Sequence, residues 1–256
     1  MLYGLYLSAQ GAQAQATRLD VLSNNVANAG TAGFKRDLAI FQSNRSYDVD
    51  NGGYSNAPGN QSALTGGVSL AKVVTDYSNG PVVHTGGALD VALSGQGFFQ
   101  VSDGNQQFLT RKGQFSLSST GELMLQNSNM RVLSSAGSGI NVPAESARIE
   151  IGSDGMVSSV TTDGARTQVA KLALVRPASD QQLEKVGNSL FRASSPVSPA
   201  GNDLQLEQGF IEQSGVTPVG EMVDMVQASR LVEANVNMIK YQDDALDRLL
   251  QSAAPH

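Results

Sequence analysis

The chain has 256 residues, of which 40% are hydrophobic and 27 are glycine, so it is long enough to bury a core and is not a simple disordered chain. A net charge of -6 and a pI near 4.9 argue against a nucleic-acid partner, because phosphate binding needs a basic surface. The absence of cysteine excludes disulfides, thiolate metal ligands and thiol nucleophiles.

The chain begins with a predicted helix from about Tyr3 to Ala27 that carries a narrow apolar stripe. The stripe is interrupted at Ser23, and the stripe residues follow one another at steps of three and four: Leu2, Leu5, Ala9, Ala12, Ala16, Leu19 and Val26. Such a stripe is typical of a coiled-coil helix. Its small alanines permit close helix approach, so we expect these residues in an assembly interface.

A turn rich in Asn and Gly is expected to end this helix, because Asn tolerates left-handed backbone and Gly adopts it freely. The turn carries Asn24, Asn25, Asn28 and Gly33. We expect Phe34, Ile40 and Phe41 to anchor it on a neighbouring surface. The basic pairs Lys35-Arg36 and Arg111-Lys112 are each too small for a nucleic-acid footprint and are expected to be solvated or interface charges.

Residues 42–67 form a predicted connector rich in Gly, Ser and Asn, and strand signals dominate from 68 to 210. Four turn dipeptides lie between apolar runs and predict hairpins: Asp103-Gly104, Thr120-Gly121, Asp154-Gly155 and Asp163-Gly164. Leu89, Val91 and Leu93 alternate with Asp90, Ala92 and Ser94, which favours a strand. Short strands with a turn every ten or so residues predict an all-β domain.

A second long helix is predicted from Pro218 to Ser252, with Thr217 as its cap and Pro218 at its first position. It also carries a stripe, which Ser229 and Asp243 interrupt: Met222, Met225, Val232, Val236, Ile239, Leu246 and Leu250. At 1.5 Å per residue the helix is about 50 Å long, too long to be buried within so small a domain. We expect its stripe to pack against other helices, in one molecule or between neighbours.

No motif of an enzyme, cofactor site or metal site is found. There is no phosphate loop and no G-x-S-x-G motif, and Gly95-Gln96-Gly97 is better explained as a bend between strands. His84 and His256 have no ligand-spaced companions, and the calcium-like start at Asp48 lacks the later ligands. We therefore predict no catalytic, cofactor-binding or metal-binding residues.

The sequence predicts an α+β fold in which a discontinuous terminal-helix domain of coiled-coil type accompanies a central all-β domain. The predicted boundaries are 1–41 and 211–256 for the helical assembly domain, 42–67 for the connector and 68–210 for the β-rich outer domain. No stretch approaches the roughly 20 apolar residues that span a bilayer. The amino-terminal segment lacks the basic start and apolar core of a secretory signal, so we expect export without cleavage.

Several segments resemble bacterial flagellar basal-body rod and hook proteins. The N-terminal signature of that family reads roughly N-N-x-A-N followed by T-x-G-F/Y-K/R, and here it is carried by Asn24, Asn25, Asn28, Gly33, Phe34 and Lys35. The resemblance continues through residues 89–99, 110–123 and 187–191, and through 208–214 into the last helix. Both distal-rod and proximal-rod members remain open, because Gly215-Val216 departs from the family's usual Asn-Val.

The resemblance implies a non-enzymatic axial subunit that polymerises into a helical homopolymer through its terminal helices, with the β domains outside. It further implies a torque-transmitting rod that crosses the periplasm, and partners among other rod and hook subunits, the surrounding ring proteins and the flagellar type III export apparatus. Two alternatives remain open from the residues themselves: a secreted β-rich adhesin or carbohydrate-binding module, and an enzyme with a scattered site.

Overall fold

The computed structural model describes residues 2–43, 67–179, 182–201 and 203–253. The chain forms two compact units, one of residues 1–27, 37–76 and 217–256, the other of residues 28–36 and 77–216. We call them the helical unit and the β unit. Their limits differ from the predicted boundaries, because residues 28–36 and 211–216 group with the β unit. Most of the predicted 42–67 connector lies outside the described residues.

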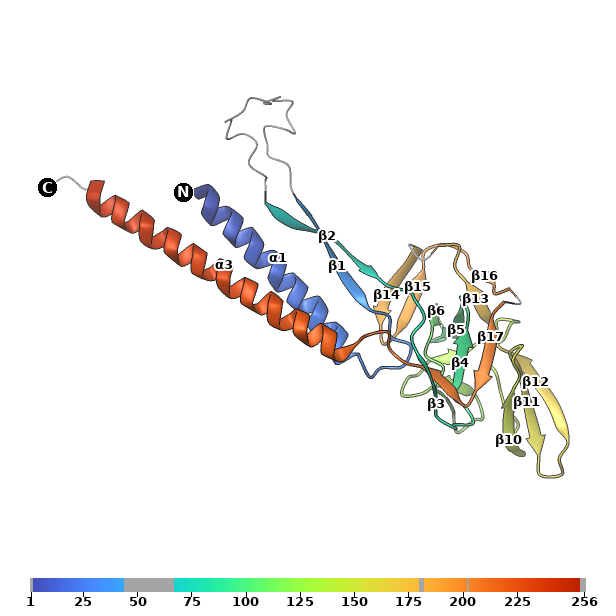
Figure 1. Ribbon diagram of the computed structural model, residues 1–256. Coiled ribbons are helices and arrows are strands. Elements are labelled where there is room, and N and C mark those ends of the chain that lie inside the picture. Colours follow the sequence, from blue (N-terminus) through green and yellow to red (C-terminus); the bar gives the residue numbers. More distant parts are fainter. Residues whose placement is uncertain (1, 44–66, 180–181, 202, 254–256) are drawn as a thin grey trace. The chain divides into compact units, whose positions relative to one another are not determined.

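Two long helices lie side by side in the helical unit, α1 (Leu2–Ala27) and α3 (Pro218–Ala253) (Figure 1). Both agree with the predicted helices to within a residue at each end. An antiparallel hairpin of β1 (Asp37–Ser43) and β2 (Val68–Thr75) also contacts α1. The predicted α+β class is confirmed.

The two helices are antiparallel and meet in a regular register. A β-carbon at Gly4 would stand 3.0 Å from the Gln242 amide, and one at Gly11 would stand 3.0 Å from Asn235. Each step of seven residues along α1 is therefore matched by a step of seven back along α3, which is the repeat of a coiled coil. The glycines make room for the amide side chains opposite them.

The β unit is built from short antiparallel strands arranged in several sheets. A nine-stranded sheet has the order β14-β15-β6-β5-β9-β8-β7, with β13 paired to β5 and β16; three smaller sheets are β10-β11-β12, β17-β4 and β18-β3. The strands are β3 (Val82–His84), β4 (Val91–Ser94), β5 (Phe98–Ser102), β6 (Gln107–Thr110), β7 (Phe115–Leu117), β8 (Leu123–Leu125), β9 (Arg131–Val132), β10 (Ser146–Ile151), β11 (Met156–Thr161), β12 (Arg166–Lys171), β13 (Leu174–Arg176), β14 (Leu183–Gly187), β15 (Leu190–Ala193), β16 (Ser198–Pro199), β17 (Gln205–Gln208) and β18 (Phe210–Glu212).

All four predicted hairpins are present, as β5–β6, β7–β8, β10–β11 and β11–β12. The glycine of each turn has positive φ, from 80° to 98°, which explains the turn dipeptides. The strand predicted from the alternation at 89–94 is present as β4, but burial does not alternate along it, because Ala92 is as buried as Val91 and Leu93. Strand β4 pairs with β17 and belongs to the interior, where both of its faces are covered.

Candidate functional site

Asn25, from the N-terminal motif, joins three elements of the helical unit. Its Nδ2 donates to the backbone carbonyl of Asp37 at 2.9 Å and to Oε2 of Glu221 at 3.2 Å, and its Oδ1 accepts from the Asp37 amide at 3.0 Å. Asn25 and Glu221 are buried. One amide side chain thus fastens the end of α1 to the start of β1 and to the first turn of α3, and only an amide can both donate and accept in this way.

On α3 the predicted stripe divides into two lines. The first line is half-buried and consists, at heptad spacing, of Met225, Val232, Ile239 and Leu246. The other line is exposed; we call it the outer line, and it consists of Met222, Ser229, Val236, Asp243 and Leu250. Its two polar members, which interrupt the stripe in the sequence, are tolerated because this line faces away from the described contacts.

The residues of α3 that contact α1 were largely missed by the sequence analysis. Glu221 bonds Asn25, Asn235 and Gln242 lie against glycines of α1, and Asp224 pairs with Arg18 at 3.5 Å. They are polar, so a search for apolar periodicity passes over them. Glu221, Asn235 and Gln242 are spaced by multiples of seven residues and are matched by Asn25, Gly11 and Gly4 of α1; this spacing is the signal that could have found these three.

On α1 the most buried side chains are likewise not those of the predicted stripe. Ser8, Ala14, Leu22 and Asn25 are buried. The stripe residues Leu5, Ala12, Ala16, Leu19 and Val26 are half-buried and Ala9 is exposed, while the side chain of Leu2 lies outside the described residues. The face of α1 that meets α3 carries Gly4 and Gly11 and is therefore turned by about one residue, or ~100°, from the apolar stripe.

The second half of the motif folds into the β unit. Gly33 has a φ of 67°, and a β-carbon there would stand 2.4 Å from the amide nitrogen of Lys112. Phe34 is buried, with Nζ of Lys185 at 3.8 Å from its ring centroid. That same Nζ donates to the carbonyl of Lys35 at 2.9 Å. Gly33 is therefore needed for both its backbone angle and its lack of a side chain.

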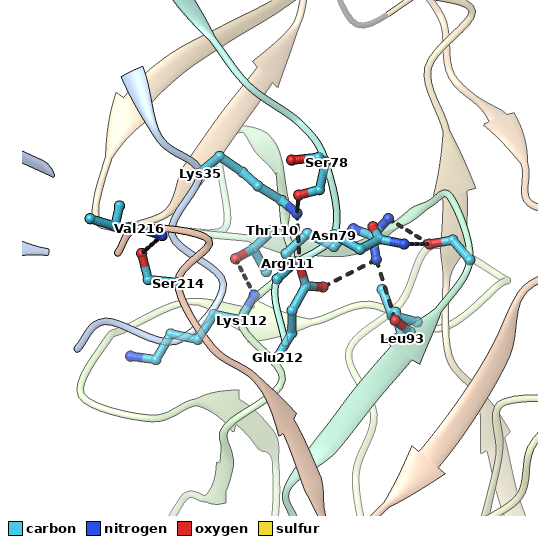
Figure 2. A network of polar contacts seen from close by, with 12 residues as sticks. Lys35, Ser78, Asn79, Leu93, Thr110, Arg111, Lys112, Glu212, Ser214 and Val216 are labelled. Atoms are coloured by element: carbon cyan, nitrogen blue, oxygen red, sulfur yellow. Dashed lines mark hydrogen bonds and ion pairs between the residues drawn. The ribbon is translucent and has the colours of Figure 1, made fainter. Parts of the chain in front are cut away.

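A buried ion network fixes this motif segment (Figure 2). Nζ of Lys35 donates to Oε1 of Glu212 at 2.6 Å and to the carbonyl of Ser78 at 2.7 Å. Nη1 of Arg111 donates to Oε2 of Glu212 at 3.2 Å. The three side chains are only 1–2% exposed. Since water is excluded, these charge-assisted hydrogen bonds are stronger than exposed ion pairs.

Three expectations for charged and anchoring residues are corrected. Lys35 and Arg111 are not solvated charges, because Glu212, remote in sequence, supplies the carboxylate that allows their burial. Ile40 is exposed rather than an anchor, and Phe41 is only half-buried. The sequence offered one signal for Glu212: it is a lone acidic residue in an otherwise uncharged segment from 208 to 216.

Three titrating groups of the β unit have shifted pKa values with evident causes. Burial lowers the pKa of Lys112, because it disfavours the charged ammonium. Amide hydrogen bonds from Gln106 and Asn105 lower the pKa of Asp103. A hydrogen bond from Arg176 lowers the pKa of Asp203. These shifts belong to a surface turn and a surface pair rather than to one cleft.

We searched the described residues for groups that could bind a metal ion or line a ligand cleft. In the described residues no three His, Cys, Asp or Glu side chains are grouped as metal ligands, and no described helix meets the length and apolarity that a membrane crossing requires. A cleft of about 690 Å³ in the β unit is lined in part by Arg148, Glu150 and Arg166, and Glu150 forms an ion pair with each arginine. His84 is exposed at the end of β3, with its ring 4.9 Å from that of Phe210.

Three family models match the chain, and they divide it as the fold does. A model of flagella basal body rod proteins matches residues 5–35, one of the flagellar hook protein FlgE/F/G D1 domain matches 92–159, and one of the flagellar basal body rod FlgEFG protein C-terminal region matches 207–252. The first and last matches cover most of α1 and α3 and each extends into the β unit, and the middle match lies wholly within the β unit.

Curated relatives extend the similarity to nearly the full length. The flagellar basal-body rod protein FlgG of Bacillus subtilis is 33% identical over 261 residues, which cover 98% of each chain. FlgG of Buchnera aphidicola subsp. Schizaphis graminum is 34% identical over 98% of this chain and 100% of its own. The rod protein FlgF of Caulobacter vibrioides is 31% identical over 86% of this chain and 85% of its own.

Proposed function

This chain belongs to the family of flagellar basal-body rod proteins, and we propose that it polymerises with further copies of itself through the outward faces of its terminal helices. It is a structural subunit of the flagellar basal-body rod and not an enzyme. The adhesin alternative finds no support among the relatives. Assembly with other flagellar subunits follows from the family, whereas the contacting faces are our proposal.

One observation carries the proposal: the contact between α1 and α3 leaves much of the apolar surface of α3 uncovered. The helix meets α1 through a mixed face that includes Glu221, Asn235 and Gln242. Its outer line is left in solvent, with Leu250 at 69% exposure. Further exposed apolar side chains on the same helix include Val226, Met238 and Tyr241. Several large apolar side chains left exposed along one helix are a feature of protein–protein interfaces.

A second copy is the occupant that the outer line fits best. The line repeats every seven residues along α3, so a further helix with the same repeat can pack beside it at coiled-coil spacing. This chain supplies such helices, and the contact between unlike faces of successive copies continues indefinitely instead of closing. The exposed Leu38, Ile40 and Leu70 of the β1–β2 hairpin add apolar surface to the same unit.

The finer parts of the proposal concern the setting of the polymer. The helices would form an inner tube and the β units an outer sleeve of a torque-transmitting rod that crosses the periplasm. Other rod and hook subunits would continue the axis, ring proteins would surround it, and the flagellar type III apparatus would export the chain without a cleaved signal. The narrow helical stripes support the tube.

The test compares two adjacent exposed positions on α3. Val236 lies on the outer line and Asn237 lies one residue, or ~100°, away from it; both are exposed in the isolated chain. Val236→Asp is expected to leave the helix pair folded but to abolish polymerisation, because a carboxylate in a helix–helix contact has to be desolvated. Asn237→Asp adds the same charge and is expected to polymerise normally.

Polymer mass is measured by sedimentation and rods are counted in isolated basal bodies, with helical content followed by circular dichroism. Assembly of the Val236→Asp chain at the level of Asn237→Asp would exclude the outer line from the interface. Equal failure of both variants would point to a general effect of charge on α3, and the proposed face would be wrong.

A further inference from the structure

In the β unit, the segments that connect it to the rest of the chain meet at one buried carboxylate, that of Glu212. The chain passes between the two units at four points, after residues 27, 36, 76 and 216. The segments of the β unit next to these points are 28–36, 77–81 and 212–216. Each of them contributes a group to the Glu212 network (Figure 2).

The contacts of Glu212 reach every one of these segments. Its backbone carbonyl accepts from the Gly33 amide at 2.9 Å, and its Oε1 accepts from Nζ of Lys35 at 2.6 Å. The same Oε1 accepts from the Gly80 amide at 2.9 Å. Oε2 accepts from Arg111, whose Nη2 also donates to the Gly95 carbonyl at 2.7 Å. From its own segment, the Glu212 carboxylate is therefore bound to the other two connecting segments, 28–36 and 77–81, and to the interior of the β unit.

We propose that Glu212 is a positioning residue that anchors the three connecting segments to the β unit, so that force carried along any of them enters the unit at one point. The anchoring itself is a property of the single chain. The mechanical use rests on the proposed function, because only a subunit of a rotating rod carries such a force.

Backbone hydrogen bonds in strands attach these segments only weakly to the β unit. Strand β18, which leads to α3, has three residues and pairs only with the three residues of β3. Segment 28–36 contains no strand. An antiparallel pair of such short strands is at best marginally stable on its own. The buried charge network strengthens this attachment. Detaching one segment from the β unit would leave charged partners buried without a counter-charge, which is costly in free energy.

A surface cluster in which a glutamate likewise lies between two cations provides the comparison. Glu150 also bridges two cations, Arg148 and Arg166, but those arginine side chains are 68% and 64% exposed. Exposed pairs contribute little, because water competes for both partners. Substituting each glutamate in turn therefore distinguishes two effects. Both substitutions remove a carboxylate that lies between two cations, but only the substitution of Glu212 removes a buried one.

The experiment measures amide hydrogen exchange in the unassembled full-length chain with Glu212→Gln, and Glu150→Gln as the matched control. In Glu212→Gln the Gly80 amide is expected to exchange about tenfold faster or more, since its buried hydrogen bond to a charged acceptor is weakened. The Gly33 amide, which donates to the backbone carbonyl of residue 212, is expected to exchange faster as well, because Lys35 two residues away loses its charged partner and segment 28–36 is held less firmly. Amides of the β10–β12 sheet are expected to keep their wild-type rates. Glu150→Gln is expected to leave the Gly33 and Gly80 amides unchanged.

A second variant, Glu212→Asp, keeps the test possible if Glu212→Gln does not fold. Glu212→Asp keeps the charge but withdraws the carboxylate by one methylene, and is expected to raise the same two exchange rates by a smaller factor. Wild-type rates at Gly33 and Gly80 in either folded variant would overturn the proposal. An equal rise throughout the β unit, or failure of both variants to fold, would also overturn it, because Glu212 would then serve general stability.

The proposed transmission of force through Glu212 is tested separately, by measuring swimming speed in cells. Rods containing Glu212→Asp are expected to reach normal length but to support slower swimming than rods containing Glu150→Gln. Normal swimming would remove the mechanical part. The exchange measurement needs no polymer, so its failure leaves the outer line of α3 untouched, and a failure of the Val236→Asp test leaves the anchor untouched.

Discussion

Gly11 of α1 lies directly against the side chain of Asn235 of α3, at the distance where a single added carbon would stand 3.0 Å from Oδ1. Gly4 and Gln242 repeat this relationship seven residues away on both helices. A large amide opposite a glycine fits only in this register, because a shift by one position would bring the amide against a side chain. Polar residues at core positions of coiled coils are known to select register in this way.

Gly11→Val is expected to separate the two helices. The branched side chain needs the space of the Asn235 amide, and overpacking of this kind costs about 1–3 kcal/mol. Thermal melting of the full-length chain, followed by the helical circular dichroism signal, should show a lower midpoint. Ala9→Val introduces the same residue at an exposed position of the same helix and should melt close to the wild type. Equal melting of the two variants would contradict the proposed register.

Asn25→Asp is expected to destabilise the helical unit by about 3 kcal/mol. The new carboxylate cannot donate to Glu221, and it places a second negative charge beside that buried side chain. Urea unfolding measured by circular dichroism gives the free energy of unfolding. Ser23→Asp adds the same charge at an exposed position two residues earlier on the same helix and serves as control. Stability equal to that of the control would show that Asn25 does not need to donate.

Gly33→Ala is expected to destabilise the β unit more than Gly104→Ala does. Both glycines have positive φ, of 67° and 98°, and positive φ alone costs an alanine about 1 kcal/mol. Only Gly33 is also crowded, with the Lys112 amide at 2.4 Å from the new carbon, whereas nothing lies within 4 Å of it at Gly104. We expect a total of about 3 kcal/mol at Gly33. Calorimetric melting of both variants measures the difference, and similar losses would mean that the close approach is relieved without cost.

The hairpin β5–β6 should lose stability in acid through Asp103. Its Oδ1 accepts from the amides of Asn105 and Gln106 at 2.8 and 2.7 Å, which holds the pKa of Asp103 below its ordinary value of 3.8. Because the pKa is lower in the folded state, this contribution is present above about pH 4 and is lost as the pH falls through the folded-state pKa.

Asp103→Asn keeps the oxygen acceptor and removes the titration. The melting temperature of the wild type should therefore fall more steeply than that of Asp103→Asn between about pH 5 and pH 2. Scanning calorimetry over a pH series checks this. Parallel profiles for the two proteins would mean that the amide bonds do not depend on the charge.

Much of the architecture follows from local chemistry and could be predicted from the sequence. Pro218 begins α3 because proline suits the first helical position, and the turn glycines 104, 121, 155 and 164 close hairpins because each has positive φ. The stripes, the four hairpins and the signature from Asn24 to Lys35 were enough to indicate the family. Each of these signals lies within a few residues of sequence, so no knowledge of distant contacts is required.

Two features depended on the tertiary structure alone. Apolar periodicity indicates that α1 and α3 pack, but the contact uses Gly4, Gly11 and amides, because shape complementarity and not hydrophobicity selects the meeting faces. Lys35 and Arg111 look like solvated charges in the sequence, and they are buried only because the fold brings Glu212 to them, 177 residues from Lys35. The stability of a buried charge depends on its partner, and a partner so distant along the chain is decided by the fold as a whole.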